Sequence, residues 1–223
     1  RAIESLLDVG AEALILISST LSKDALASYA HQVPVVSLLR DEVGDLVDSV
    51  SSDDHAGIRL AIDHLTSLGH RSIAHVDGGT AVSAGHRREA FRKEMARHGL
   101  KPVVVAGGPH EEDGIRAGRG VLREGGLTAV VAFNDRCALG VMESLRGAGL
   151  KVPDDVSVLG YDDSQFARLS YVQLSSVSQD APLIAAAAVD RAVDRVEGTI
   201  SPGHVIRTPH LAVRKTTAQA VSV

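Results

Sequence analysis

Short apolar runs alternate with amphipathic segments of about 10–15 residues along the whole chain, which predicts crossover units and a mainly parallel sheet flanked by helices. The fold class expected is therefore α/β. Extended runs are expected at residues 13–17, 35–39, 47–50, 72–76, 103–106, 130–133, 156–159, 174–177 and 206–214. Helices are expected at residues 2–9, 22–30, 53–68, 85–97, 113–123, 137–146 and 181–196. No low-complexity linker interrupts the alternation, so a domain boundary must be a crossing of strands.

Composition narrows the possible partners. The 223 residues are 44% hydrophobic and 23% charged, with a formal net charge of -5, which argues against direct contact with nucleic acid phosphates. The single Cys137 excludes an internal disulfide and is expected to be a small buried apolar group, although a helix start could lower its pKa. No run approaches the roughly 20 apolar residues of a membrane span. The chain opens on Arg1 without an initiator Met, so we expect a fragment of a longer protein.

The most informative segment is PDDVSVLGYDD at residues 153–163, an apolar strand that ends on a glycine, an aromatic residue and two carboxylates. In an open parallel sheet, small ligands bind beyond the carboxyl ends of the strands. Asp162 is therefore placed to accept hydrogen bonds from a hydroxyl-bearing ligand. The alternative is that Asp162 and Asp163 form a solvated turn.

Polar residues also follow three other expected strands. Ser83 and Arg87 come after residues 72–76, Asp113 comes after residues 103–106, and Asn134 comes after residues 130–133. Hydroxyl, guanidinium, amide and carboxylate groups at one sheet edge suit a polar small molecule.

Each of these residues also has a purely structural alternative. Asn134 or Asp135 could cap the helix that follows. Arg87 could pair with Glu89 or Glu94 on its own helix.

Catalytic and cofactor motifs are absent from the sequence. It has no G-x-G-x-x-G after a strand, no Walker loop, no H-E-x-x-H and no G-x-S-x-G. The ten histidines are scattered, and the pair Asp162 and Asp163 lacks the lysine and second acidic strand end that a metal or phosphoryl site would need. We expect no cofactor, no metal and no catalytic residue.

Six segments, in order, resemble the effector-binding core of the lactose-repressor (LacI/GalR) family of transcriptional regulators. They are DDHAGIRLAIDHLTSLGHRSI (53–73), GHRREAF (85–91), AFNDRCALG (132–140), VPDDVSVLGYDD (152–163), SVSQD (176–180) and VRKTT (213–217). The resemblance implies a periplasmic-binding-protein-like fold of two similar lobes joined by three crossings, with the effector between them. Residues 1–51 and 179–207 would form one lobe, and residues 52–178 and 208–223 the other. The family's helix-turn-helix headpiece would precede Arg1.

The resemblance also implies effector contacts. Arg87, Asn134 and Asp162 match the contacting positions of the family, Ser83 and Asp113 match more variable pocket positions, and Gln179 lies at a crossing.

Two positions depart from the family. An aromatic residue often stands where Asp113 is, so this pocket would depend on hydrogen bonds more than on stacking. An aspartate often stands where Leu39 is, before the arginine that matches Arg40, so one ligand contact could be missing.

The expected function is that of a cytoplasmic, ligand-gated regulator that binds a sugar, nucleoside or similar metabolite and reaches operator DNA only through the missing headpiece. A homodimer is expected through the helix with Ala138 and Leu139 and the loop with Phe166 and Tyr171, unless these residues belong to the core. The alternative is a solute-binding protein for sugar uptake, which shares the architecture. A sugar-phosphate isomerase or hydrolase would need a base or metal that the sequence does not place.

Overall fold

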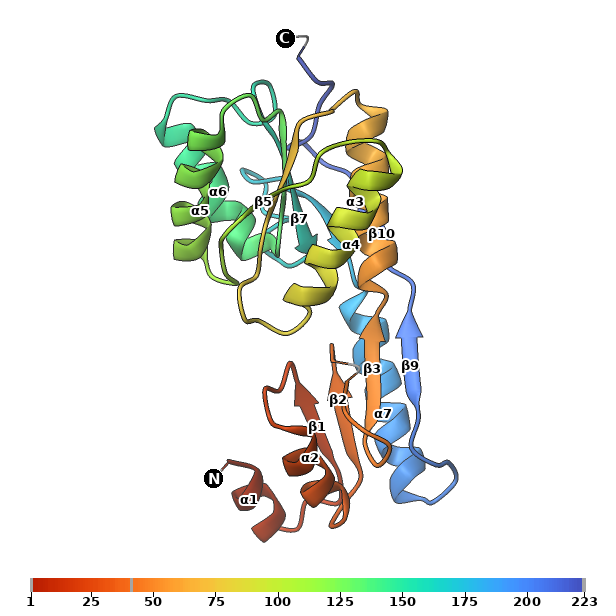
Figure 1. Cartoon of the computed structure of the whole chain (residues 1–223). Coiled ribbons are helices and arrows are strands. Elements are labelled where there is room, and N and C mark those ends of the chain that lie inside the picture. Colours follow the sequence, from red (N-terminus) through yellow and green to blue (C-terminus); the bar gives the residue numbers. More distant parts are fainter. Residues whose placement is uncertain (1, 41, 222–223) are drawn as a thin grey trace. The chain divides into compact units, whose positions relative to one another are not determined.

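A computed structural model of the chain describes residues 2–40 and 42–221. The backbone forms two compact units, Arg1–Ser52 with Ala181–Arg207 and Asp53–Asp180 with Thr208–Val223. The chain therefore passes from one unit to the other three times. Each unit contains its own β-sheet (Figure 1).

The first unit is a parallel sheet in the order β1-β2-β3-β9. Its strands are β1 (Leu14–Ile17), β2 (Val35–Leu38), β3 (Asp48–Ser52) and β9 (His204–Arg207). Its helices are α1 (Ala2–Asp8), α2 (Lys23–Ala30) and α7 (Ala181–Val196). Successive residues of a strand point to opposite faces, and accordingly Val35 packs in the cluster of α2 while Val36 packs in that of α7. Both faces of this sheet are thus covered.

The second unit is a six-stranded sheet in the order β10-β8-β7-β6-β4-β5, in which only β10 runs antiparallel. Its strands are β4 (Ile73–Val76), β5 (Val103–Val105), β6 (Ala129–Ala132), β7 (Ser157–Asp162), β8 (Ser175–Ser178) and β10 (His210–Ala212). Its helices are α3 (Asp54–Ser67), α4 (Ala84–Arg97), α5 (Glu111–Glu124) and α6 (Asp135–Gly147). Along β6, Val130 packs in the cluster that includes α5 and α6, and Val131 packs in the cluster that includes α3 and α4. Tyr161 of β7 belongs to the second of these clusters.

The predicted α/β fold with mainly parallel sheets is confirmed, and several element boundaries differ. The last extended run, predicted at residues 206–214, is two strands that pair in different sheets, because Thr208 and Pro209 interrupt it where the chain changes units. Helix α5 begins two residues before the predicted Asp113.

Helices α5 and α6 lie side by side because glycines let their backbones meet (Figure 1). A Cβ atom at Gly114 of α5 would overlap the carbonyl oxygen of Cys137, and one at Gly140 of α6 would overlap the carbonyl oxygen of Glu111. No side chain fits at either position without moving one helix.

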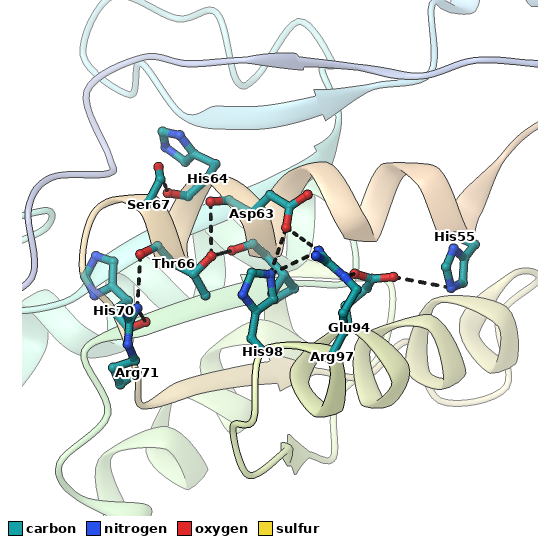
Figure 2. A network of polar contacts seen from close by, with 11 residues as sticks. His55, Asp63, His64, Thr66, Ser67, His70, Arg71, Glu94, Arg97 and His98 are labelled. Atoms are coloured by element: carbon teal, nitrogen blue, oxygen red, sulfur yellow. Dashed lines mark hydrogen bonds and ion pairs between the residues drawn. The ribbon is translucent and has the colours of Figure 1, made fainter.

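A polar network joins α3 to α4 (Figure 2). Asp63 of α3 pairs with Arg97, and His98 Nε2 lies 2.8 Å from the same carboxylate. Arg97 Nε also donates to the buried Glu94 at 2.6 Å, and Glu94 lies 3.5 Å from His55 of α3. Burial raises the pKa of Asp63, but the hydrogen bonds and charges of Arg97 and His98 outweigh this effect, so the pKa lies below its usual value. The network fixes the register of α3 against α4.

Replacement of Gly140 tests the close approach of α5 and α6. We expect Gly140→Ala to lower the free energy of unfolding by roughly 1–3 kcal/mol, because the added methyl group forces the helices apart. Gly147→Ala, on the same helix but with open space around its Cβ position, is the control and should be neutral or slightly stabilising. Urea unfolding measures both, and equal stabilities of the two variants would contradict the account.

Candidate functional site

Four neighbouring strands of the second unit, β4, β6, β7 and β8, run parallel, so their carboxyl ends lie at one edge of the sheet. Polar residues occupy all four ends: Asp77 after β4, Asn134 after β6, Asp162 at the end of β7 and Gln179 after β8. In open parallel sheets generally, ligands bind at the edge where the carboxyl ends of the strands lie.

Arg87 of α4 contacts residues from several elements at this edge. Its guanidinium is buried, with Nε donating to Asp54 Oδ1 at 2.8 Å and Nη1 donating to the carbonyl oxygen of Phe133 at 2.7 Å. The guanidinium carbon also lies 3.6 Å from the centroid of the Tyr161 ring and 4.9 Å from that of Phe133. Although burial opposes the charge, Asp54, Tyr161 and Asp162 raise the pKa of Arg87 above its usual value. Arg87 is therefore a fixed cation between α3, β6 and β7.

The structural alternative considered for Arg87 is wrong. Glu89 pairs with Lys93 at 3.7 Å, and Glu94 pairs with Arg97. The buried partner of Arg87 comes from another helix.

Asp162 lies next to Arg87. Its Oδ1 accepts a hydrogen bond from Gln179 Nε2 at 2.7 Å and is 3.9 Å from Arg87 Nη1. Its side chain is 39% exposed, and its φ of 104° is unusual for a residue with a Cβ. Burial raises the pKa of Asp162, while Arg87 and Gln179 oppose that rise. The structure thus brings together Arg87, Asp162 and Gln179, three of the predicted site residues.

Asn134 is the N-terminal cap of α6, a role for which the sequence offered either Asn134 or Asp135. Its Oδ1 accepts from the backbone N–H of Cys137 at 2.8 Å, and its Nδ2 donates to the carbonyl oxygen of Pro109 at 3.0 Å. Asp135 is instead the first residue of α6. Cys137 is buried as predicted, and burial raises the pKa of its thiol to about 12.

Among the described residues, the side chains of Asp113 and Ser83 form no hydrogen bond or ion pair with Arg87, Asp162 or Gln179. Asp113 accepts from the backbone N–H of His110 at 3.0 Å and pairs with Arg116, so it closes the first turn of α5. Ser83 begins α4 with a φ of 67°, and its carbonyl oxygen accepts from the backbone N–H of Arg87 at 3.0 Å.

The two adjacent carboxylates at the end of β7 have different partners. Asp163 pairs with Arg168 at 2.7 Å and with Arg214 at 2.5 Å, whereas the partners of Asp162 are Arg87 and Gln179. The possibility of a solvated turn is therefore wrong for Asp163, which is buried. Within residues 2–40 and 42–221, no three His, Cys, Asp or Glu side chains are grouped as a metal site.

Sequence reasoning did not assign a role to Asp54 or Tyr161. Asp54 looks like an ordinary acidic residue in the first turn of a helix, and Tyr161 was noted only as part of a motif. One signal was available: a Cβ atom at Gly57, one turn after Asp54, would overlap the Tyr161 hydroxyl. At this glycine, the backbone of α3 packs directly against the Tyr161 side chain of β7.

Comparison with known proteins agrees with this architecture. Residues 62–217 match the model of a periplasmic binding protein-like domain. A LacI transcriptional regulator from Rhodococcus species superposes with a TM-score of 0.96 and 43% identity, over 98% of this chain and 82% of that one. The chain belongs to the LacI family of transcriptional regulators.

Two further relatives are known in complex with other molecules. The lactose operon repressor of Escherichia coli is 32% identical over 97% of this chain, and the structure of the lac repressor dimer bound to operator and an anti-inducer has a TM-score of 0.86. That structure covers 97% of this chain and 77% of its own, at 31% identity. The complex of the regulator CelR with cellobiose has a TM-score of 0.86 and 30% identity, over 96% of this chain and 68% of that one.

The predicted family and its two-lobed, periplasmic-binding-protein-like fold are confirmed. The chain spans 61% of the lactose operon repressor and 51% of a related regulator from Streptomyces limosus. None of the helices in the described residues is both long and apolar enough for a bilayer span.

Asp135 offers a test of the electrostatics at this edge. Burial raises the pKa of Asp135 from 3.8 to about 6, although Ser176 Oγ and the Ser164 N–H donate hydrogen bonds to its carboxylate at 2.6 Å. Between these two pH values the folded chain keeps a proton that the unfolded chain has lost, so the free energy of unfolding should fall as pH rises through this window. The loss is on the order of 3 kcal/mol.

Urea unfolding from pH 4 to 7 would measure the free energy of unfolding of the wild type and of Asp135→Asn. The loss should appear in the wild type and be absent from the variant, which lacks the titrating group. Asp154→Asn removes an exposed carboxylate and should keep the wild-type slope. Parallel pH profiles for the wild type and Asp135→Asn would show that Asp135 is ionised normally.

Proposed function

We propose that this chain is the effector-binding and dimerisation core of a LacI-type transcriptional regulator. A small polar metabolite, most simply a sugar or a nucleoside, would bind at the strand edge of the second unit and change the affinity of the whole protein for operator DNA. The cluster of Arg87, Asp162 and Gln179 at this edge is the observation that carries the proposal. The relatives named above are regulators, which favours this function over solute uptake and over catalysis.

The proposed contacts follow from the donors and acceptors that the fold leaves available. Asp162 can accept hydrogen bonds from two neighbouring hydroxyls, because only one of its oxygens is engaged by Gln179. Ser83, Asp113 and Asn134 would complete the site, although Asn134 would have to share its amide with the α6 cap. The CelR–cellobiose complex supports a sugar as one suitable effector class.

Operator DNA would be contacted outside residues 1–223. The chain is acidic, with a net charge of -5, so its own surface does not suit the phosphate backbone. We propose that an N-terminal headpiece binds the DNA. The two units would have the roles of the family's two lobes, and the protein would act in the cytoplasm. An effector that changes operator affinity 5- to 150-fold needs a coupling free energy of only about 1–3 kcal/mol.

A homodimer is the proposed assembly. A groove of about 730 Å³ is lined by Leu139 and Met142 of α6 and by Phe166 and Tyr171 of the loop before β8. Tyr171 is 78% exposed, whereas Ala138 is buried and belongs to the core rather than to an interface. The dimeric lac repressor structures among the relatives support pairing of this kind.

Effector binding can be tested by calorimetry against a panel of sugars and nucleosides that includes cellobiose and lactose. For any ligand that binds, Asp162→Asn and Arg87→Lys should weaken affinity about 10- to 100-fold, since hydrogen bonds to charged groups contribute roughly 1.5–3 kcal/mol. Asp154→Asn, at the opposite end of β7, should bind like the wild type. Unchanged affinity in both site variants would refute the assignment of the site.

The dimer can be tested by analytical ultracentrifugation. The wild type should sediment as a dimer, and Tyr171→Asp should shift it towards monomer, because a buried unpaired carboxylate opposes association. Val9→Asp, at an equally exposed apolar residue of the first unit, should leave the mass unchanged. A monomeric wild type at micromolar concentration would contradict the proposed interface.

A further inference from the structure

The charges at the proposed site do not balance. Arg87 supplies one positive charge, while Asp54 at 2.8 Å and Asp162 at 3.9 Å supply two negative charges. Near this edge, Arg88 pairs with Asp77, and Arg168 and Arg214 share the single carboxylate of Asp163. Within the group of Arg87, Asp54 and Asp162 itself, the described residues hold no uncompensated positive charge for an incoming anion.

Asp54 is the residue that neutralises Arg87. Both side chains are at least nine-tenths buried, so their attraction is weakly screened. Asp54 is also the first residue of α3, where the helix dipole favours a negative charge. The face of the guanidinium is covered by the Tyr161 ring. The charge of Arg87 is thus balanced by the protein itself, and Arg87 is available to a ligand as a hydrogen-bond donor rather than as an unpaired cation.

Asp162 gives the site its excess negative charge. It is the most exposed member of the group, so a ligand that approaches Arg87 meets this carboxylate. A hydroxyl group can donate to it, whereas a phosphate or carboxylate group would face like charge across a short distance.

We propose that this site selects an uncharged, hydroxyl-bearing effector and excludes phosphorylated and acidic metabolites, with Asp54 as a specificity-determining residue that cancels the charge of Arg87. The inference rests on the proposed function, because it concerns the ligand of the same site. It removes sugar phosphates from the candidate effectors.

Inorganic phosphate is the first probe, since it tests the charge of the site without knowledge of the effector. The reporter is the Nε–H NMR signal of Arg87, assigned by its loss in Arg87→Lys, during a phosphate titration at constant ionic strength. In the wild type this signal should not respond to phosphate. In the double variant Asp54→Asn/Asp162→Asn, which leaves Arg87 without a carboxylate, it should shift and saturate at millimolar phosphate.

Two carboxylates must be removed together, because in Asp54→Asn alone the guanidinium can turn to Asp162. The matched control is Glu124→Gln/Asp154→Asn, which makes the same change in net charge at two exposed carboxylates of the same unit and should behave like the wild type. A phosphate response of Arg87 in the wild type, or none in a folded double variant, would overturn the proposal.

The double variant buries an unpaired cation and could fail to fold. In that case Asp162→Asn, which keeps the Arg87–Asp54 pair, should still show no response of the Arg87 signal to phosphate. A response comparable to that of free guanidinium would show that Asp54 does not cancel the charge.

Paired sugars are the second probe. Wild-type affinity is measured for glucose against glucose 6-phosphate and for ribose against ribose 5-phosphate, with cellobiose as a further neutral sugar. Where either member of a pair binds, the neutral sugar should bind at least 10-fold more tightly, and the reverse order would overturn the proposal. If no sugar binds, the proposed sugar effector is wrong, and the phosphate titration alone decides the charge selectivity.

Discussion

The ion pair between Arg87 and Asp54 is the interaction on which the proposed site depends. It joins α4 to the start of α3, and the Tyr161 ring of β7 lies against the same guanidinium. A buried ion pair adds little net stability, since desolvation offsets much of the Coulomb attraction, yet loss of one partner leaves a costly buried charge. The pair therefore fixes the position of Arg87 more than it stabilises the unit, and this precision is what a ligand-binding cation needs.

Most of the fold could be predicted from the sequence because the sheets are buried on both faces. A strand that is covered on both sides is often a short apolar run, as at Val130 and Val131, so most strands stand out from the amphipathic helices. Sheet order and the split of the last extended run could not be read in this way. They depend on pairing between segments far apart in the chain, and Thr208 and Pro209 carry no local signal that two different sheets lie on either side.

Half of the candidate site followed from a single rule, that residues after parallel strands meet at one edge. The rule placed Arg87 and Asp162 at the same edge, and the resemblance to the family added Gln179. It could not find Asp54, which lies 33 residues before Arg87 at the start of a helix, because nothing local distinguishes a carboxylate that caps its own turn from one that neutralises a distant arginine.

The hydrogen bonds that the fold itself requires decide which edge residues remain available to a ligand. The Oδ1 of Asn134 accepts a hydrogen bond at the α6 N-terminus, and its Nδ2 donates to the carbonyl oxygen of Pro109. Asp163 pairs with two arginines. Asp162 differs because only its Oδ1 accepts a hydrogen bond, from Gln179, which leaves the other oxygen without a protein donor among the described residues. A half-exposed carboxylate beside an already neutralised arginine is a poor structural anchor. It is, however, a good acceptor for hydroxyl groups, and this contrast is the physical reason to look for the effector at Asp162 rather than at its better-bonded neighbours.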